Sequence, residues 1–141
     1  MENKSPVQIN HLQHTGIPVT NIATSEAFYN RLGFRNVMQS DFVNNNETGT
    51  CIMMQHNSVI IELYQMPDSQ LQEIRGRKNG HIDHIAFDVD DIDKAFTDLK
   101  AASFQIIEDA PVFLPFWNKG CKYFNMLGPD GERLEFNQIS K

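Results

Sequence analysis

The sequence predicts an α+β fold made of two tandem copies of one unit, each a strand, a helix and three more strands. The main evidence is an internal repeat at an offset of 70 residues, by which the segment 11–14 (HLQH) recurs as 81–84 (HIDH). The same offset aligns Cys51 with Cys121, and near the C-terminus an offset of 73 matches Glu62 with Glu135. Similarity at a fixed period is the signature of a duplicated supersecondary unit.

The repeat also predicts the domain organisation. The two modules span about residues 11–67 and 81–138, with a polar linker at 68–80 and a tail at 1–10. A copy of about 57 residues would be marginally stable alone, because small chains bury little of their surface. We therefore expect one domain over 11–138.

In the first module, alternating apolar residues predict a strand at 11–19. Thr24 or Ser25 is a suitable helix cap, and Ala27 and Phe28 follow at helical spacing. Gly33 is a natural C-terminal stop for this helix. The remaining strands are expected at 35–43, 49–55 and 58–65.

In the second module, the corresponding strand is expected at 82–89, and Asp90 or Asp91 is placed to cap the next helix. Ala95, Phe96 and Leu99 form the apolar stripe of that helix. The remaining strands are expected at 104–109, 120–127 and 132–138, with a hairpin turn at Pro129–Asp130–Gly131.

Composition excludes several classes of protein. The chain has 141 residues, 40% of them hydrophobic, a mean hydropathy of −0.41 and a net charge of −6. It has no basic cluster for a nucleic acid or an anionic membrane, and no apolar run of membrane-spanning length. The polar start, residues 1–10, lacks the apolar core of an export signal. Two cysteines do not make a disulfide framework, so a cytoplasmic protein is expected.

Two histidines and two glutamates are the candidate chemical groups. Because side chains alternate along a strand, His14, Glu62, His84 and Glu135 should all project from the sheet face opposite the helices. A sheet that curls would gather them into one concave site. Imidazole nitrogen and carboxylate oxygen suit a divalent Ni, Zn, Co, Mn or Fe ion. Four protein ligands would leave open positions at which substrate oxygens are polarised.

Several other residues have less specific patterns. His11 and His81 precede the candidate ligands by three positions and should face the other way. Cys51 and Cys121 are expected to be small buried hydrophobes. The apolar stretch 113–117 indicates either packing or a wall over the cavity. The residues expected to line a substrate pocket are Tyr64, Phe116, Trp117, Tyr123 and Asn125.

The motifs around these residues resemble the vicinal oxygen chelate superfamily, which includes glyoxalases, bleomycin-resistance proteins and dioxygenases. His14 lies in QHTG, Glu62 in IIEL, His84 in DHIA and Glu135 in GERLEF, which follows the hairpin motif GPDG at 128–131. The resemblance covers about residues 11–138. It implies two βαβββ modules whose curled mixed sheet forms a cup around a divalent metal ion, commonly in a homodimer that acts on a small molecule.

Within this superfamily, the ligand set resembles glyoxalase I more than methylmalonyl-CoA epimerase, which usually has glutamine where Glu62 stands. The resemblance implies a lactoylglutathione lyase-like enzyme, a lyase or isomerase that works through a metal-stabilised enediolate, with Glu135 or Glu62 as the base. The chain departs from bacterial glyoxalase I at Pro18 and Met66, where arginine and asparagine usually help to hold glutathione.

Two alternative functions share the same fold. One is a small-molecule binding or antibiotic-resistance protein, although the bleomycin-binding members generally lack the four ligands and the fosfomycin enzymes typically use one glutamate. The other is an extradiol-type dioxygenase, which needs a distal catalytic histidine. Inside the first module His56 is the spare candidate for that role.

Overall fold

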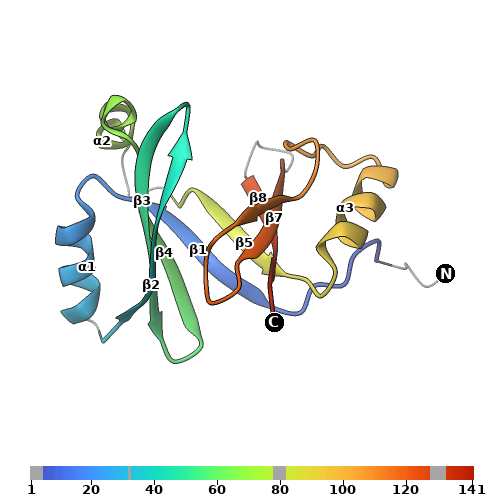
Figure 1. Cartoon of the computed structure of the whole chain (residues 1–141), viewed down its shortest axis with the longest axis horizontal. Coiled ribbons are helices and arrows are strands. Elements are labelled where there is room, and N and C mark those ends of the chain that lie inside the picture. Colours follow the sequence, from blue (N-terminus) through green and yellow to red (C-terminus); the bar gives the residue numbers. More distant parts are fainter. Residues whose placement is uncertain (1–4, 32, 78–81, 128–132) are drawn as a thin grey trace. The chain divides into compact units, whose positions relative to one another are not determined.

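The computed structural model describes residues 5–31, 33–77, 82–127 and 133–141. The chain forms two compact units, one of residues 14–83 and the other of the N-terminal residues through Gln13 together with 84–141. Strand, helix and three strands follow one another twice along the chain (Figure 1). The predicted α+β class with two βαβββ modules is therefore confirmed. The predicted turn at 128–131 and His81 lie outside the described residues.

The unit 14–83 contains a mixed sheet of four strands in the order β2-β3-β4-β1. Strand β1 runs parallel to β4, and the other neighbours are antiparallel. The expected strand positions are correct to within two residues. The elements are β1 (Leu12–Pro18), α1 (Ile22–Arg31), β2 (Arg35–Asn44), β3 (Glu47–His56) and β4 (Val59–Gln65).

Helix α1 begins earlier than the predicted cap at Thr24 or Ser25. The side-chain oxygen of Asn21 accepts a hydrogen bond from the Thr24 N–H at 3.0 Å, so Asn21 satisfies the first turn. The predicted stop is correct, because Gly33 adopts a φ of 95°, a left-handed conformation that glycine adopts without strain. The following Phe34 N–H then bonds back to the Tyr29 carbonyl at 3.1 Å.

The core of this unit lies between α1 and one face of the sheet. Val19, Ile52, Met54 and Leu63 are its buried residues, and Ile17, Ile61 and Tyr29 are among those that pack against them. The helix contributes Ile22 and Tyr29, whereas Phe28, at the predicted helical spacing, is 53% exposed. The apolar members of β1 and β4 thus face the helix, as their alternation predicts.

The polar linker expected at 68–80 contains helical structure in its first part. A short 3₁₀ helix (Asp68–Gln70) leads into α2 (Leu71–Gly76). Leu71 is 4% exposed and anchors α2 on the unit, and an ion pair joins Arg77 to Glu73 one turn earlier. Leu71 and Ile74 are the two apolar residues of this polar segment, too few to establish a helical period, so the sequence indicated a linker.

The second unit contains another mixed sheet, in the order β5-β8-β7-β6, with β5 parallel to β8. The N-terminal segment runs beside β5, since the Asn10 N–H bonds to the Asp88 carbonyl and the Asp88 N–H to the His11 carbonyl, both at 2.9 Å. No described helix is long and apolar enough to cross a membrane. The elements are β5 (His84–Asp88), α3 (Ile92–Ala101), β6 (Val112–Leu114), β7 (Cys121–Leu127) and β8 (Arg133–Ile139).

The strand predicted at 104–109 is wrong as a regular strand. Ile106 forms an isolated bridge with Met126, and regular pairing with β7 begins only at β6. Between them Pro111 has no N–H to donate to a ladder. Just before that break, the Glu108 carboxylate accepts the Asn125 N–H at 2.7 Å, so a side chain supplies the acceptor on this edge.

The core of this unit confirms the predicted stripe of α3. Ala95 and Leu99 are buried against Phe124 and Phe136, and Phe96 packs at the edge of this cluster. Ile85, which alternation places on the same face of β5 as Phe87, is 37% exposed. Phe124 and Phe136 thus anchor β7 and β8 on the helix side of the sheet.

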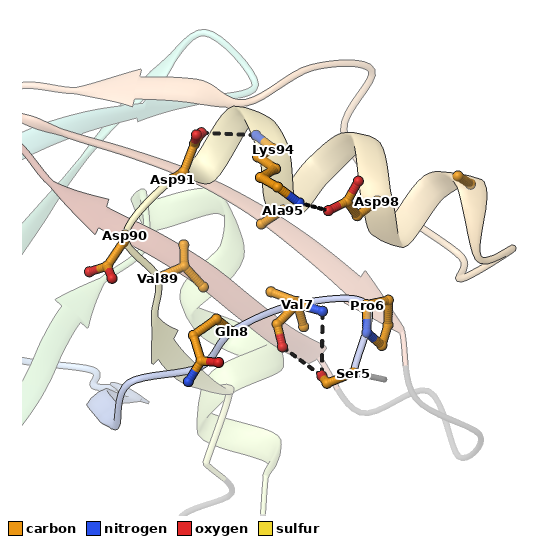
Figure 2. A pocket seen from close by; sticks show the side chains of 11 residues that line it. Ser5, Pro6, Val7, Gln8, Val89, Asp90, Asp91, Lys94, Ala95 and Asp98 are labelled. Carbon is orange, nitrogen blue, oxygen red and sulfur yellow. Dashed lines mark hydrogen bonds and ion pairs between the residues drawn. The ribbon is translucent and has the colours of Figure 1, made fainter. Parts of the chain in front are cut away.

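Of the two predicted caps of α3, Asp91 is the one in place. Its carboxylate accepts the Lys94 N–H at 3.0 Å at the start of the helix (Figure 2). We expect Asp91→Ala to lower the free energy of unfolding by about 1 kcal/mol, because an orphan backbone donor loses its partner. Urea denaturation measures this cost. Asp90→Ala is the control, because Asp90 bonds to Asn10 and not to the helix; an equal cost in both variants would contradict the cap assignment.

Candidate metal centre

The first predicted pair, His14 and Glu62, comes together within the unit 14–83. Gly16 of β1 lies beside Glu62 of β4 in the parallel ladder, so His14, two residues before Gly16, projects from the same face as the carboxylate. His14 is 1% exposed, and its Nε2 lies 3.4 Å from Oε2 of Glu62. The apolar face of both strands points to α1, so the pair occupies the opposite face.

The second predicted pair repeats this arrangement. Ala86 of β5 lies beside Glu135 of β8, and His84 again stands two residues before the paired position. Both side chains are buried, and Nε2 of His84 lies 3.7 Å from Oε1 of Glu135. The sequence repeat therefore corresponds to the same strand register at both pairs. Within each module, the candidate histidine lies next to the candidate glutamate.

The separations within the pairs, 3.4 Å and 3.7 Å, equal or slightly exceed that of two tetrahedral ligands of one ion. They exceed the roughly 2.7–3.2 Å of a direct N–H···O hydrogen bond. Ligand atoms bound about 2.1 Å from a common ion lie about 3.0 Å apart at octahedral angles and about 3.4 Å apart at tetrahedral angles. A donor set of imidazole and carboxylate also suits the borderline divalent metals. The residues present thus fit the metal site that the sequence predicts.

Glu135 is held by a chain of buried amides that sequence reasoning missed. The Asn137 side chain donates to Oε2 of Glu135 at 3.1 Å. Gln13 in turn donates to Oδ1 of Asn137 at 3.1 Å and to the Asp88 carboxylate at 3.2 Å. The alternation that placed Asn137 on the Glu135 face was the available signal. Asn137 thus binds one carboxylate oxygen of Glu135, and the other oxygen, Oε1, is the one that lies near His84.

Burial raises the pKa of the Glu135 carboxyl above its ordinary value. The His84 imidazole, the hydrogen bond from Asn137 and the Arg133 charge oppose this increase, while the Glu108 carboxylate adds to it. Desolvation is the largest cause, because a buried charge loses its hydration. A carboxylate in this position gains from a cation bound beside it.

Three of the five predicted pocket residues lie on the same sheet faces as the candidate ligands. Tyr64 follows Glu62 by two positions in β4, while Tyr123 and Asn125 of β7 lie opposite Asn137 and Glu135 of β8. Phe116 and Trp117 lie instead in the connection between β6 and β7, where Phe116 is 5% exposed. The stretch 113–117 is thus partly an edge strand, since Phe113 and Leu114 belong to β6.

The expected equivalence of Cys51 and Cys121 is wrong. Cys51 pairs with Tyr64, two positions after Glu62, whereas Asn137, two positions after Glu135, pairs with Tyr123. The structural counterpart of Cys51 is therefore Tyr123, because the second module has two more residues between its histidine and this strand. Both cysteines are free and buried, as predicted for small hydrophobes.

Two further histidines, His11 and His56, lie in the part of the chain that the structure describes. His11 is exposed, with its Nδ1 4.0 Å from an Asp88 oxygen. His56 ends β3 on the side of Ile52 and Met54, where its ring lies 5.6 Å from that of Phe34. His56 therefore faces the helix side of the sheet, which removes the candidate for a distal catalytic histidine.

A groove of about 520 Å³ lies elsewhere in the second unit (Figure 2). It runs between the N-terminal segment and one side of α3, as far as Ala101 at the end of the helix. None of the four candidate ligands lines it. Its walls include Val7, Asp90, Lys94 and Asp98, so it belongs to the helix side of this unit and not to the ligand face.

Comparison with known proteins identifies the family. Residues 9–136 match the family model described as Glyoxalase/Bleomycin resistance protein/Dioxygenase superfamily, and the chain belongs to this superfamily. The uncharacterized protein YwbC of Bacillus subtilis (strain 168) is 30% identical over 138 residues, covering 90% of this chain and 96% of its own. The predicted resemblance is thus confirmed.

Solved structures show the same fold. Methylmalonyl-CoA epimerase from Mycobacterium tuberculosis has a TM-score of 0.76 at 17% identity, covering 100% of this chain and 94% of its own. A variant of the Streptomyces coelicolor epimerase in complex with 2-nitronate-propionyl-CoA has a TM-score of 0.75 at 19% identity, covering 95% and 100%. A hypothetical protein from Bacillus halodurans C-125 has a TM-score of 0.72 at 23% identity, covering 93% and 95%.

Proposed function

We propose that this protein is a metal-dependent isomerase or lyase that moves a proton next to a carbonyl group in a small substrate with two adjacent oxygens. The four metal ligands would be His14, Glu62, His84 and Glu135. The observation that supports this best is the recurrence of a buried histidine beside a glutamate at the same strand register in both units.

One ion for both pairs is the simplest arrangement of these donors. Each pair supplies two ligand atoms, whereas protein sites for divalent zinc or iron usually take three or four protein ligands. Membership of the superfamily supports the same arrangement. The ions that fit are Ni, Zn, Co, Mn and Fe in the divalent state, because none of the four ligands is a thiolate.

The residues of the chain divide the proposed chemistry among them. When bound, the metal supplies Lewis-acid polarisation of the substrate oxygens. Glu135 is our first choice for the base, because Asn137 fixes one of its oxygens and burial raises its proton affinity. It would take a proton from the carbon beside the carbonyl and return it to the carbonyl carbon, while the substrate's hydroxyl proton passes to the former carbonyl oxygen, so the atoms balance. Glu62 is the second candidate, in the same register of the other unit.

The substrate is proposed only as a class. The solved structures that share this fold include methylmalonyl-CoA epimerases, and epimerisation at a carbon atom moves a proton, which supports proton transfer as the type of reaction. A lactoylglutathione lyase-like reaction would use the same step on an α-hydroxycarbonyl compound. Glutathione itself is not proposed, because Pro18 and Met66 replace its usual contacts. Ring cleavage is disfavoured by the position of His56.

The proposal predicts one metal ion per chain. We expect protein stripped of metal and titrated with Mn²⁺ or Zn²⁺ to bind one equivalent, and His14→Ala and His84→Ala each to weaken binding by more than about 100-fold. Calorimetry and elemental analysis measure both. His11→Ala is the matched control, because His11 is an exposed histidine three residues before His14. Retention of one tight equivalent in either ligand variant would overturn the shared centre.

A further inference from the structure

Asn125 stands directly beside Glu135 in the second unit. The two residues are paired across β7 and β8. The Asn125 N–H bonds to Glu108 and its carbonyl accepts the Ile107 N–H at 2.9 Å, so both backbone groups point away from β8. Asn125 and Glu135 are therefore a non-hydrogen-bonded pair, the type whose Cα atoms lie about 4.5 Å apart and whose side chains approach most closely.

Glu108 determines which end of the Asn125 amide faces this site. Its Oε1 accepts both the backbone N–H at 2.7 Å and the side-chain Nδ2 at 2.9 Å. An ionised carboxylate can only accept, so the nitrogen must be the end that faces Glu108. The other end, Oδ1, is then fixed as an acceptor. No alternative assignment of the amide satisfies Glu108.

The Oδ1 atom of Asn125 is buried and has no hydrogen-bond partner among residues 5–31, 33–77, 82–127 and 133–141. The residue as a whole is 8% exposed. A buried amide oxygen without a partner is costly, so a native structure keeps one mainly where something else supplies the donor. The neighbouring Glu135 carboxylate is itself an acceptor, so a molecule bound beside it can supply the donor.

The first unit has no such acceptor at the equivalent position. There Met53 lies opposite Glu62, and a methionine sulfur is at most a weak acceptor. The acceptor is therefore not required by the repeated fold but belongs to the His84–Glu135 side alone.

We propose that Asn125, oriented by Glu108, selects substrates that present a hydroxyl group beside the carbonyl, because Oδ1 accepts the hydroxyl proton next to Glu135. The substrate class would then be α-hydroxycarbonyl compounds and not malonyl-type esters, whose second oxygen group is an anionic carboxylate without a donor. Asn125 is a specificity residue and Glu108 a positioning residue. This inference rests on the proposed function, since it concerns the molecule bound at that site.

The test compares two ketones that differ only in the donor. Full-length protein loaded with Mn²⁺ or Zn²⁺ is incubated in D₂O with hydroxyacetone or with its methyl ether, methoxyacetone, and exchange of the methylene protons is followed by NMR. We expect kcat/KM for hydroxyacetone to be at least about tenfold higher, the effect of one hydrogen bond to a buried acceptor. Asn125→Leu, of similar volume, should reduce this preference to below about twofold.

Glu108→Gln provides a second variant that keeps the side-chain length. A glutamine amide can accept or donate, so the orientation of Asn125 is no longer fixed and the preference should fall several-fold. Asp109→Asn, the exposed neighbour, is the control and should retain the wild-type preference. Equal rates on both ketones in the wild type, or an unchanged preference in Asn125→Leu, would overturn the inference.

Two further outcomes separate this inference from the proposed function. If Asn125→Leu loses the metal as a ligand variant does, Oδ1 serves the ion and the inference is wrong. If neither ketone exchanges in the wild type, the proposed proton transfer is wrong. In that case the proposed preference for a hydroxyl group is tested by binding alone. The affinity of each ketone is measured from the relaxation of its protons by protein-bound Mn²⁺. An affinity ratio of about tenfold that Asn125→Leu removes supports it, and equal affinities overturn it.

Discussion

Glu135→Gln is expected to stabilise the metal-free protein while abolishing its stabilisation by metal. Glutamine keeps an oxygen that can accept from Asn137, but it removes a charge whose burial is unfavourable. At pH 8 in the presence of EDTA, we expect the free energy of unfolding to rise by about 1–3 kcal/mol, the usual cost of an incompletely compensated buried polar group. With saturating Mn²⁺ the order should reverse, because only the wild type binds the ion tightly.

The pH dependence of this difference has a defined sign. The pKa of Glu135 is raised from 4.5 in the folded protein, so between 4.5 and the folded value the folded state binds more protons than the unfolded state. The stability contributed by this group is therefore present below pH 4.5 and is lost as the pH rises through the folded pKa. We expect the advantage of Glu135→Gln to be absent near pH 4 and to grow as the pH rises through the folded pKa.

Glu73→Gln is the matched control for this titration. The Glu73 carboxyl is exposed, and its hydrogen bond to Arg77 lowers its pKa, so its contribution has the opposite sign. Urea denaturation from pH 4 to pH 8 should therefore show a small loss of stability for this variant at neutral pH. A Glu135→Gln protein that is less stable than the wild type at pH 8 without metal would contradict the account of a buried, unfavourable charge.

The positions of the four candidate ligands within their units could be predicted from the sequence. Alternation along a strand determines the face on which a side chain lies, and the repeat places a histidine and a glutamate on the corresponding face in both modules. The burial of His14, His84 and Glu135 and the two short separations followed from these patterns. The period of two was informative here because Ile61, Leu63 and Phe136 give an unambiguous apolar face.

The surroundings of the ligands were less predictable, because they depend on register. A repeat offset of 70 at the histidines becomes 72 between Met53 and Asn125, and 73 at the glutamates, so alignment by cysteines was misleading. Glu108 lies on an interrupted edge where the sequence indicated a regular strand. Its contact with Asn125 joins residues 17 positions apart through a side chain, which no periodicity reports.

Phe124→Ala is expected to be the most destabilising of the proposed substitutions. Phe124 is 0% exposed, stacks on Phe136 at 5.2 Å between ring centroids, and meets Phe96 edge-on at 5.3 Å. Truncation of a buried phenylalanine leaves a cavity and costs about 3–5 kcal/mol. Thermal or urea unfolding measures this loss. Phe104→Ala, at a residue that is 44% exposed, is the control and should cost less than about 1 kcal/mol.

The same substitution should also weaken metal binding in the protein that remains folded. Phe124 directly precedes Asn125 in β7, and Phe136 directly follows Glu135 in β8. The aromatic pair therefore holds these two strands from the helix side, while Asn125 and Glu135 lie on the other face. A ligand whose supporting residues are loosened binds metal about 10–100-fold more weakly. Phe124→Leu, which fills most of the cavity, should recover most of the affinity. Unchanged Mn²⁺ affinity in folded Phe124→Ala would show that the aromatic core serves stability alone.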